Sequence, residues 1–252
     1  MSSPIIPGAE PMSFVGSRPT GALVVHGFTG NPGSMRILAD AFAGAGHHVE
    51  MPLLAGHGTH VDDMVPTRWA HWAADTEAAY QRLAARADKI VVLGLSMGGA
   101  LTLRMGADHP EIAGLVCINP AAQPQGDETV AMLTGLADSG TETMPAIGSD
   151  IADPDAHESA YDATPVRALA SLLGDGIAPL AVEYPAMHVP LLLMNSPQDH
   201  VVQPEQAEYL ATSYGGVVER VTLERSFHVA TQDFDKALIV EQALTFADRV
   251  FA

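Results

Sequence analysis

Basic side chains are scarce in this sequence. It contains 12 Lys and Arg residues against 30 Asp and Glu residues, which gives a formal net charge of −18. This charge opposes binding to nucleic acid, to anionic membrane surfaces and to highly anionic substrates, whereas a neutral ester remains compatible with it. We therefore expect no nucleic-acid partner. The acidity fits a role in solubility or salt tolerance equally well.

Cysteine is almost absent as well. With one cysteine in the chain, no intramolecular disulfide can form. Cys117 lies within the apolar run Gly114–Ile118, and no histidine-bearing motif surrounds it. We predict a buried and inert thiol, not a catalytic one.

Long hydrophobic runs are also lacking. No apolar run reaches the roughly 18 residues of a membrane span, and the N-terminal residues show neither the basic stretch nor the apolar core of a signal peptide. We expect a cytoplasmic protein without a stable membrane anchor. The length of 252 residues suits one α/β domain, residues 1–252, with no second independent domain.

The most informative stretch surrounds Ser96. An apolar run, Val91–Leu93, leads into Gly94-Leu95-Ser96-Met97-Gly98, and helix-forming residues follow. In a G-x-S-x-G turn the serine hydroxyl stands out at the end of a strand, and the small residues on each side let the chain reverse. The turn also aims the N–H of Met97 at the place where a carbonyl oxygen would gain negative charge. A glycine-rich loop without catalytic function would show the same pentapeptide.

Three further segments strengthen the catalytic interpretation. Residues 22–30 have the pattern of a buried strand that ends in a His-Gly-Phe-Thr-Gly loop, and two later strands end near Asp199 and His228. The order Ser96, Asp199, His228 is typical of α/β-hydrolases and differs from the order in other serine-hydrolase folds. Together the four segments predict a Ser-His-Asp triad.

The pattern of apolar residues predicts alternating strands and helices. Continuous apolar strands are expected where helices cover both faces of a parallel sheet. Strands are expected at residues 12–15, 22–27, 47–52, 89–95, 114–119, 189–194 and 218–223, and helices at 32–43, 68–87, 97–108, 204–213 and 234–251.

Residues 121–188 have a different composition from the core at about 1–120 and 189–252. They are short helical pieces rich in Ala, Asp, Gly and Met, without convincing strands. An insertion at this point of a βα series predicts a lid over the edge of the sheet where ligands bind. Within it, Thr164-Pro165 is expected to open a helix through Leu173, and Asp153-Pro154 a shorter helix that contains Glu158.

Over essentially its whole length the sequence resembles the α/β-hydrolase superfamily, and more narrowly the small bacterial monoacylglycerol lipases and their carboxylesterase relatives. The resemblance implies a mostly parallel central sheet flanked by helices, with a small helical lid inserted after the sixth strand. It is carried by these segments: His26–Asn31, Gly56-His57-Gly58, Gly94–Gly99, Ile147–Asp150, Glu158–Tyr161 with Thr164-Pro165, Asp199–Val202 and Phe227–Thr231.

The resemblance also implies roles for individual residues. Ser96 would be the nucleophile, Asp199 the acid and His228 the base, with the N–H groups of Phe28 and Met97 as the oxyanion hole. The lid residues Glu158 and Ile147 would bind substrate, Glu158 by contacting glycerol hydroxyls. A solvated helix face is the alternative for Glu158. Six apolar lid residues are expected to line an acyl-chain tunnel: Met132, Leu133, Leu136, Met144, Ile147 and Ile151.

The sequence therefore predicts a serine hydrolase, without metal or cofactor, that cleaves monoacylglycerols through an acyl-enzyme. A small lipid ester is the expected ligand, and an apolar lid rim would favour transient contact with lipid aggregates. A general short- to medium-chain carboxylesterase, a perhydrolase and a non-catalytic ligand-binding α/β-hydrolase are the alternatives. His57 and His60 could suggest a metal site, but they lack a companion cysteine or fixed carboxylate. His200 is disfavoured as the base because that residue usually follows the final strand.

Overall fold

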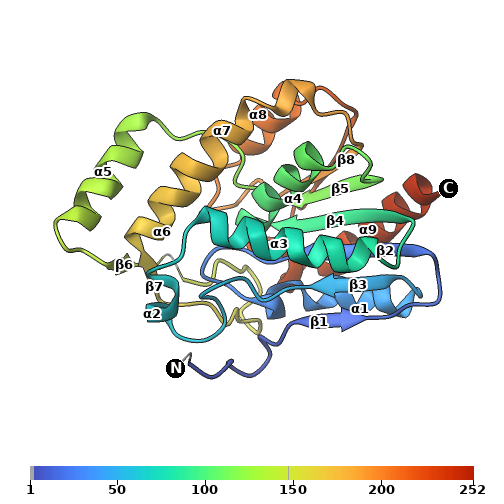
Figure 1. Ribbon diagram of the computed structural model, residues 1–252, viewed down its shortest axis with the longest axis horizontal. Helices are drawn as coiled ribbons and strands as arrows, with labels where there is room; N and C mark the ends of the chain where they lie inside the picture. The colour runs from blue at the N-terminus through green and yellow to red at the C-terminus, as the bar shows by residue number, and fades with distance from the viewer. Residues whose placement is uncertain (1–2, 147) are drawn as a thin grey trace.

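The protein is built around a seven-stranded sheet with the strand order β1-β3-β2-β4-β5-β8-β9 (Figure 1). The computed structural model describes residues 3–146 and 148–252. β1 pairs with β3 in antiparallel fashion, and the other pairs of this sheet are parallel. The strands are β1 (Met12–Phe14), β2 (Thr20–Val25), β3 (His48–Met51), β4 (Lys89–Leu95), β5 (Gly114–Ile118), β8 (Leu191–Asn195) and β9 (Val218–Thr222).

Helices cover both faces of this sheet, which is why its central strands are apolar on both sides. On one face, α1 and α9 pack against the sheet through residues such as Phe42 and Phe246. On the other face, α3, α4 and α8 pack through residues such as Trp72, Leu103 and Leu210 (Figure 1). The bounds are α1 (Arg36–Gly44), α2 (Val61–Met64), α3 (Trp69–Ala84), α4 (Met97–Asp108), α8 (Glu205–Ser213) and α9 (Lys236–Phe251), with short 3-10 turns at Pro32–Met35, Tyr184–Ala186 and Ala230–Gln232.

The expected insertion lies between β5 and β8 and forms the projecting part at the left of Figure 1. It follows the fifth strand of the chain and not the sixth, because residues 3–11 form no strand ahead of β1. It contains α5 (Asp127–Asp138), β6 (Thr143–Pro145), β7 (Ala163–Pro165), α6 (Val166–Ser171), a π-helical turn (Leu172–Ile177) and α7 (Ala178–Ala181).

Two expectations for this insertion are wrong in detail. The helix expected from Asp153 is absent, and residues 148–162 form a loop, because the N–H groups of Ala152 and Asp153 donate to the distant carboxylate of Asp233. The insertion also contains two strands, β6 and β7, which pair antiparallel. Each is three residues long and ends in proline, so neither shows the alternation that predicts a strand.

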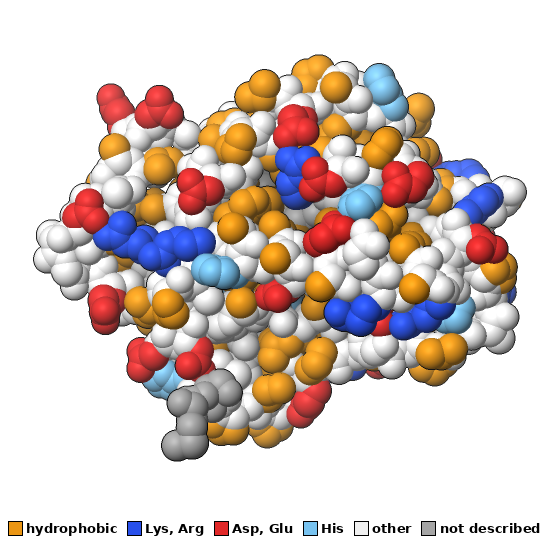
Figure 2. Space-filling view, viewed as in Figure 1, with side chains coloured by type: hydrophobic (Ala, Val, Ile, Leu, Met, Phe, Trp, Pro, Cys, Tyr) orange, Lys and Arg blue, Asp and Glu red, His pale blue; other side chains and the backbone are white. Residues whose placement is uncertain are grey.

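The surface matches the acidic composition. On the face seen in Figure 2, acidic side chains are spread widely, and the few basic ones lie in separate groups. Within the described ranges, no helix is long and apolar enough to cross a membrane. Cys117 is buried on β5, and burial raises the pKa of its thiol.

Candidate active site

Ser96 occupies a strained turn between β4 and α4. Its φ of 58° and ψ of −117° lie in a region that residues with a Cβ rarely adopt. The flanking glycines make this turn possible. A Cβ on Gly98 would lie 2.2 Å from the carbonyl oxygen of Val25, and one on Gly94 would lie 2.0 Å from the carbonyl oxygen of Gly98. The spacing of the two glycines is therefore a steric requirement of the turn.

Asp199 and His228 meet at the carboxyl ends of β8 and β9. Nδ1 of His228 lies 2.7 Å from Oδ2 of Asp199, and both residues are buried. Because an ionised carboxylate can only accept, the imidazole donates through Nδ1 and leaves Nε2 available as a proton acceptor. The other carboxylate oxygen accepts the N–H groups of Val201 and Val202 at 2.8 Å each. Both oxygens of Asp199 are thus engaged, and its orientation is fixed.

The neighbouring His200 has a different partner. Its Nδ1 lies 2.8 Å from Asp150, and its side chain is 59% exposed. Of the two histidines, His228 is therefore the one that contacts Asp199.

Ser96 and His228 line one cavity of about 690 Å³. Among the described residues, the Ser96 hydroxyl makes no hydrogen bond to the imidazole; such contacts often tighten only when substrate binds. The cavity lies outside the carboxyl ends of the parallel strands, where ligands of open α/β sheets bind. On the side of the insertion, an apolar stretch of its wall is formed by Leu133, Leu169, Leu172, Leu173 and Ile177.

The two residues expected to form an oxyanion hole both lie close to Ser96. Met97 is the first residue of α4, so its N–H has no acceptor within the helix. Phe28 follows β2 and lines the cavity. Its loop abuts the serine, since a Cβ on Gly27 would lie 3.4 Å from the Cβ of Ser96. Thr29 has a φ of 60°, so this loop is strained like the serine turn.

Glu158 lines the same cavity from the insertion. Its carboxylate lies over Gly30, where a Cβ would be 2.9 Å from Oε1. The surrounding protein shields this carboxylate from water and raises its pKa, and the nearby His228 opposes that shift. The second substrate-binding residue expected from the sequence, Ile147, lies outside the described residues.

Only part of the expected acyl tunnel lines the cavity. Leu133 and Met144 do so. Met132 and Leu136 instead face solvent, with 58% and 40% of their surface exposed, because they lie on the outer side of α5. Ile151 packs against the core cluster that includes α1 and α9. The sequence interpretation had assigned this wall to Met132, Leu136 and Ile151. Apolar residues of α6 and of the following π-helical turn line the cavity instead.

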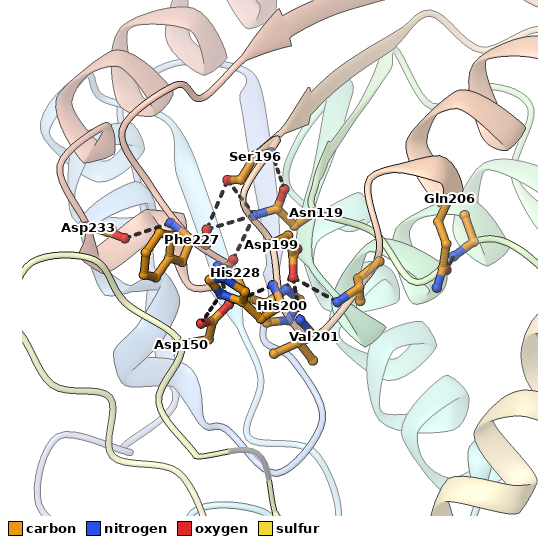
Figure 3. A network of polar contacts seen from close by, with 12 residues as sticks. Asn119, Asp150, Ser196, Asp199, His200, Val201, Gln206, Phe227, His228 and Asp233 are labelled. Carbon is orange, nitrogen blue, oxygen red and sulfur yellow. Dashed lines mark hydrogen bonds and ion pairs between the residues drawn. The ribbon is translucent and has the colours of Figure 1, made fainter.

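Three polar residues that the sequence interpretation missed hold the loops around His228 (Figure 3). Asn119, with a φ of 43°, donates to the carbonyl oxygens of Phe227 and His228 at 3.2 and 2.8 Å. Asp150 accepts the N–H of His228 at 3.1 Å. Asp233 accepts the N–H of Phe227 at 2.9 Å. Asn119 and Asp150 lie 109 and 78 residues from His228, so no local sequence pattern indicates these contacts.

Two buried histidines lie beneath the Phe28 loop. Nε2 of His26 accepts the N–H of Leu54 at 3.2 Å, and burial lowers the pKa of His26 to about 4. The ring of His57 packs edge-on against that of His26, with a centroid separation of 5.0 Å, and burial also lowers its pKa. In the part of the chain that the structure describes, no three His, Cys, Asp or Glu side chains are grouped to hold a metal ion.

Comparisons with known proteins agree with this architecture. The family model described as Hydrolase_4, serine aminopeptidase S33, matches residues 18–235. A thermostable monoacylglycerol lipase of Bacillus sp. (strain H-257) is 41% identical over 246 residues, which cover 96% of each chain. A carboxylesterase of Bacillus subtilis (strain 168) is 24% identical over 96% of this chain and 97% of its own.

A solved structure supports the same assignment. It comes from a study of LipS and LipT, two metagenome-derived lipolytic enzymes, and matches with a TM-score of 0.91 and 42% sequence identity. The match covers 98% of this chain and 100% of that one. The chain therefore belongs to the Hydrolase_4 (serine aminopeptidase, S33) family and is an α/β-hydrolase resembling monoacylglycerol lipases.

Proposed function

We propose that this enzyme hydrolyses monoacylglycerols to glycerol and free fatty acid. It is a carboxylic ester hydrolase. The observation that carries the narrower proposal is the position of Glu158, a carboxylate that lines the same cavity as Ser96 and as an apolar stretch of wall from the insertion. Such a cavity suits a substrate with a long apolar chain and a small hydroxylated head. The 41% identity to a monoacylglycerol lipase supports the same substrate class.

In this proposal Ser96 attacks the ester carbonyl. Nε2 of His228 takes the hydroxyl proton and passes it to the departing glycerol oxygen, which leaves the acyl group on Ser96. Water, deprotonated by the same nitrogen, then attacks the acyl-enzyme; the bond between the acyl carbon and Oγ of Ser96 breaks, the imidazole returns the proton to Oγ, and the fatty acid is released. Asp199 holds the imidazole in the required tautomer, and their 2.7 Å contact supports that role.

The N–H groups of Phe28 and Met97 stabilise the oxyanion that forms in both steps. The position of Met97 at the start of α4 supports this role, because the helix dipole also favours negative charge there. Glu158 accepts hydrogen bonds from the glycerol hydroxyls, while the acyl chain lies along the apolar wall formed by α6 and the π-helical turn.

The first test is the hydrolysis of a panel of 1-monoacylglycerols, p-nitrophenyl esters, diacylglycerols and triacylglycerols, with Ser96→Ala as the blank. We expect a strong preference for monoacylglycerols. Glu158→Ala should reduce monoacylglycerol turnover much more than p-nitrophenyl ester turnover. Equal effects on the two substrates would contradict the role of Glu158. Activity on simple esters alone would leave a carboxylesterase of unknown substrate.

The catalytic roles have their own test. His228→Ala should lower turnover by several powers of ten, by analogy with other triads. Near-full esterase activity in this variant would overturn the assignment of the base. Labelling of Ser96 by a fluorophosphonate would exclude a purely ligand-binding protein.

The proposal includes a cytoplasmic location and transient contact with lipid aggregates through the exposed side chains of Met132 and Leu136. Cell fractionation tests the location. Co-sedimentation with neutral lipid vesicles tests the contact, and Met132→Ser with Leu136→Ser should weaken it.

A further inference from the structure

Asp150 connects the insertion to both loops that carry the Asp199–His228 pair (Figure 3). Its side chain is 11% exposed. Oδ2 accepts the N–H of His228 and the N–H of His200, both at 3.1 Å. Oδ1 lies 2.8 Å from Nδ1 of His200. The main-chain carbonyl of Asp150 also accepts the N–H of Val229 at 3.0 Å.

This arrangement ties together the two chain segments whose separation sets the contact between Asp199 and His228. One segment follows β8, and His200 is the next residue after Asp199. The other follows β9 and contains His228 itself. A single carboxylate oxygen accepts one backbone N–H from each, so movement of Asp150 would alter the distance between the acid and the base.

We propose that Asp150 is a positioning residue for His228, supplied by the insertion. This inference rests on the proposed catalytic roles of His228 and Asp199. A hydrogen bond in which the acceptor is a carboxylate is stronger than one between neutral groups. A displacement of a catalytic group by about 1 Å can cost on the order of a hundredfold in rate. The insertion therefore contributes to the alignment of the imidazole as well as to the substrate cavity.

The imidazole of His200 supports Asp150. It contacts Oδ1, the carboxylate oxygen that the two N–H groups do not share, and its ring packs edge-on against Phe227 with a centroid separation of 4.7 Å. Phe227 directly precedes His228. His200 thus contacts and orients the carboxylate of Asp150, whereas His228 contacts Asp199.

The experiment compares the whole enzyme with Asp150→Ala, Asp150→Asn and Asp153→Ala, measured on a p-nitrophenyl ester and a monoacylglycerol. Asn retains an oxygen that can accept both N–H groups, whereas Ala retains none. The carboxylate of Asp153, three residues further on, accepts the N–H of Asp155 within the same loop and serves as the matched control. We expect Asp150→Ala to lower kcat about ten- to a hundredfold on both substrates with little change in KM.

Asp150→Asn should restore kcat to within a few-fold of the parent enzyme, and Asp153→Ala should leave it unchanged. A second readout is the low-field proton resonance of the His228 Nδ1–H that is shared with Asp199. It should be sharp in the parent enzyme and in Asp150→Asn, and broadened or lost in Asp150→Ala. A role limited to stability would leave the resonance intact at temperatures where the variant is folded.

The failures of the two proposals are distinguishable. An active His228→Ala variant would overturn the proposed function. An inactive His228→Ala variant together with an Asp150→Ala variant that behaves like Asp153→Ala would overturn the positioning role alone. If Asp150→Ala does not fold, Asp150→Glu replaces it, since it keeps the charge but moves the carboxylate by one methylene. Unchanged kcat and an unchanged low-field resonance in Asp150→Glu would then contradict the inference.

Discussion

Two parts of the insertion are attached to the rest of the molecule in different ways. The anchored loop, residues 148–162, is joined by hydrogen bonds to several other segments, in addition to the contacts of Asp150 with the loops after β8 and β9. Asp233 accepts N–H groups from Ala152 and Asp153, the side chain of Asn31 donates to the carbonyl of Ser159, and the hydroxyl of Tyr161 donates to the carbonyl of Gly56 at 2.9 Å.

Among the described residues, the helix α5 makes no comparable set of hydrogen bonds to other segments. It buries a single residue, Leu133, in a small cluster with Val166 and Ala170. Met132 and Leu136 face solvent. Its link to α6 through Asp138 and Arg167 is an exposed ion pair, and such pairs contribute little to stability.

This difference in attachment corresponds to the two functions proposed for the cavity, recognition of the glycerol head and binding of the acyl chain. Glu158 lies on the anchored loop, so these hydrogen bonds restrain the main chain that carries the group proposed to recognise the glycerol head. The apolar wall includes α5, whose few buried contacts predict local opening at low free energy. A fixed polar end suits a head group of constant size, and an adaptable apolar wall suits acyl chains of different lengths.

The largest expected effect on stability comes from replacing Asp233, which holds the anchored loop. The buried carboxylate of Asp233 accepts four backbone N–H groups, from Ala152, Asp153, Phe227 and Phe234, at 2.7 to 3.0 Å. Asp233→Ala leaves these buried donors without their acceptor, so we expect the free energy of unfolding to fall by about 3–5 kcal/mol. Urea denaturation measures the loss, and amide hydrogen exchange at Ala152 and Asp153 should accelerate.

The matched variant on α5 is Asp138→Ala. Its carboxylate is 62% exposed, so its loss should change the free energy of unfolding by less than about 0.5 kcal/mol. Similar losses in Asp138→Ala and Asp233→Ala would show that the two parts of the insertion are equally attached and would refute the comparison.

Low pH should decrease the free energy of unfolding through His26, the buried histidine beneath the Phe28 loop. The pKa of His26 is about 4 in the folded protein, against 6.5 for an unperturbed histidine. Below pH 6.5 His26 takes up a proton in the unfolded chain but stays neutral in the folded protein until the pH approaches 4. The contribution of the neutral, buried His26 to the free energy of unfolding is therefore complete above pH 6.5 and is lost as the pH falls towards 4. Between pH 7 and pH 5 we expect a loss on the order of 2 kcal/mol.

The comparison variant is His26→Gln, which keeps an acceptor for the N–H of Leu54 and does not titrate. The difference in free energy of unfolding between parent and variant, measured by urea denaturation at both pH values, isolates His26 from the other titrating groups. Parallel losses in the two proteins would contradict the prediction.

The sequence predicts the catalytic half of the fold well because its determinants are local. The bounds expected for β4 and α4 agree with the structure, since an unbroken apolar run and a glycine-bracketed serine specify both elements within 20 residues. The turn at Ser96 follows from the clash that a Cβ on Gly94 or Gly98 would cause. The approach of His228 to Asp199 follows from strand order, because adjacent parallel strands end at one edge.

The insertion is predicted poorly because its conformation depends on distant partners. Asp153-Pro154 is a sound helix start in isolation, yet the N–H of Asp153 donates to Asp233, which lies 80 residues away. Asp150 and Asn119 show no local sign of their contacts with His228. Met132 and Leu136 have the apolar character expected of a tunnel wall, but only the packing of α5 decides which of its faces is buried.

A smaller effect than those at Asp233 and His26 is expected for Tyr161, whose side chain joins the end of the anchored loop to residues 56 and 59. Its hydroxyl donates to Gly56 and accepts the N–H of Thr59 at 3.0 Å, so Tyr161→Phe should lower the free energy of unfolding by about 1 kcal/mol. Glu158 lies three residues earlier, and its displacement should raise KM for monoacylglycerols more than for p-nitrophenyl esters. Tyr209→Phe on α8 is the control. In the proposed mechanism, kcat/KM for simple esters depends on Ser96 and His228 and not on the head-group contact. An equal loss on both substrates would therefore show that the anchored loop supports the triad alone and does not position Glu158.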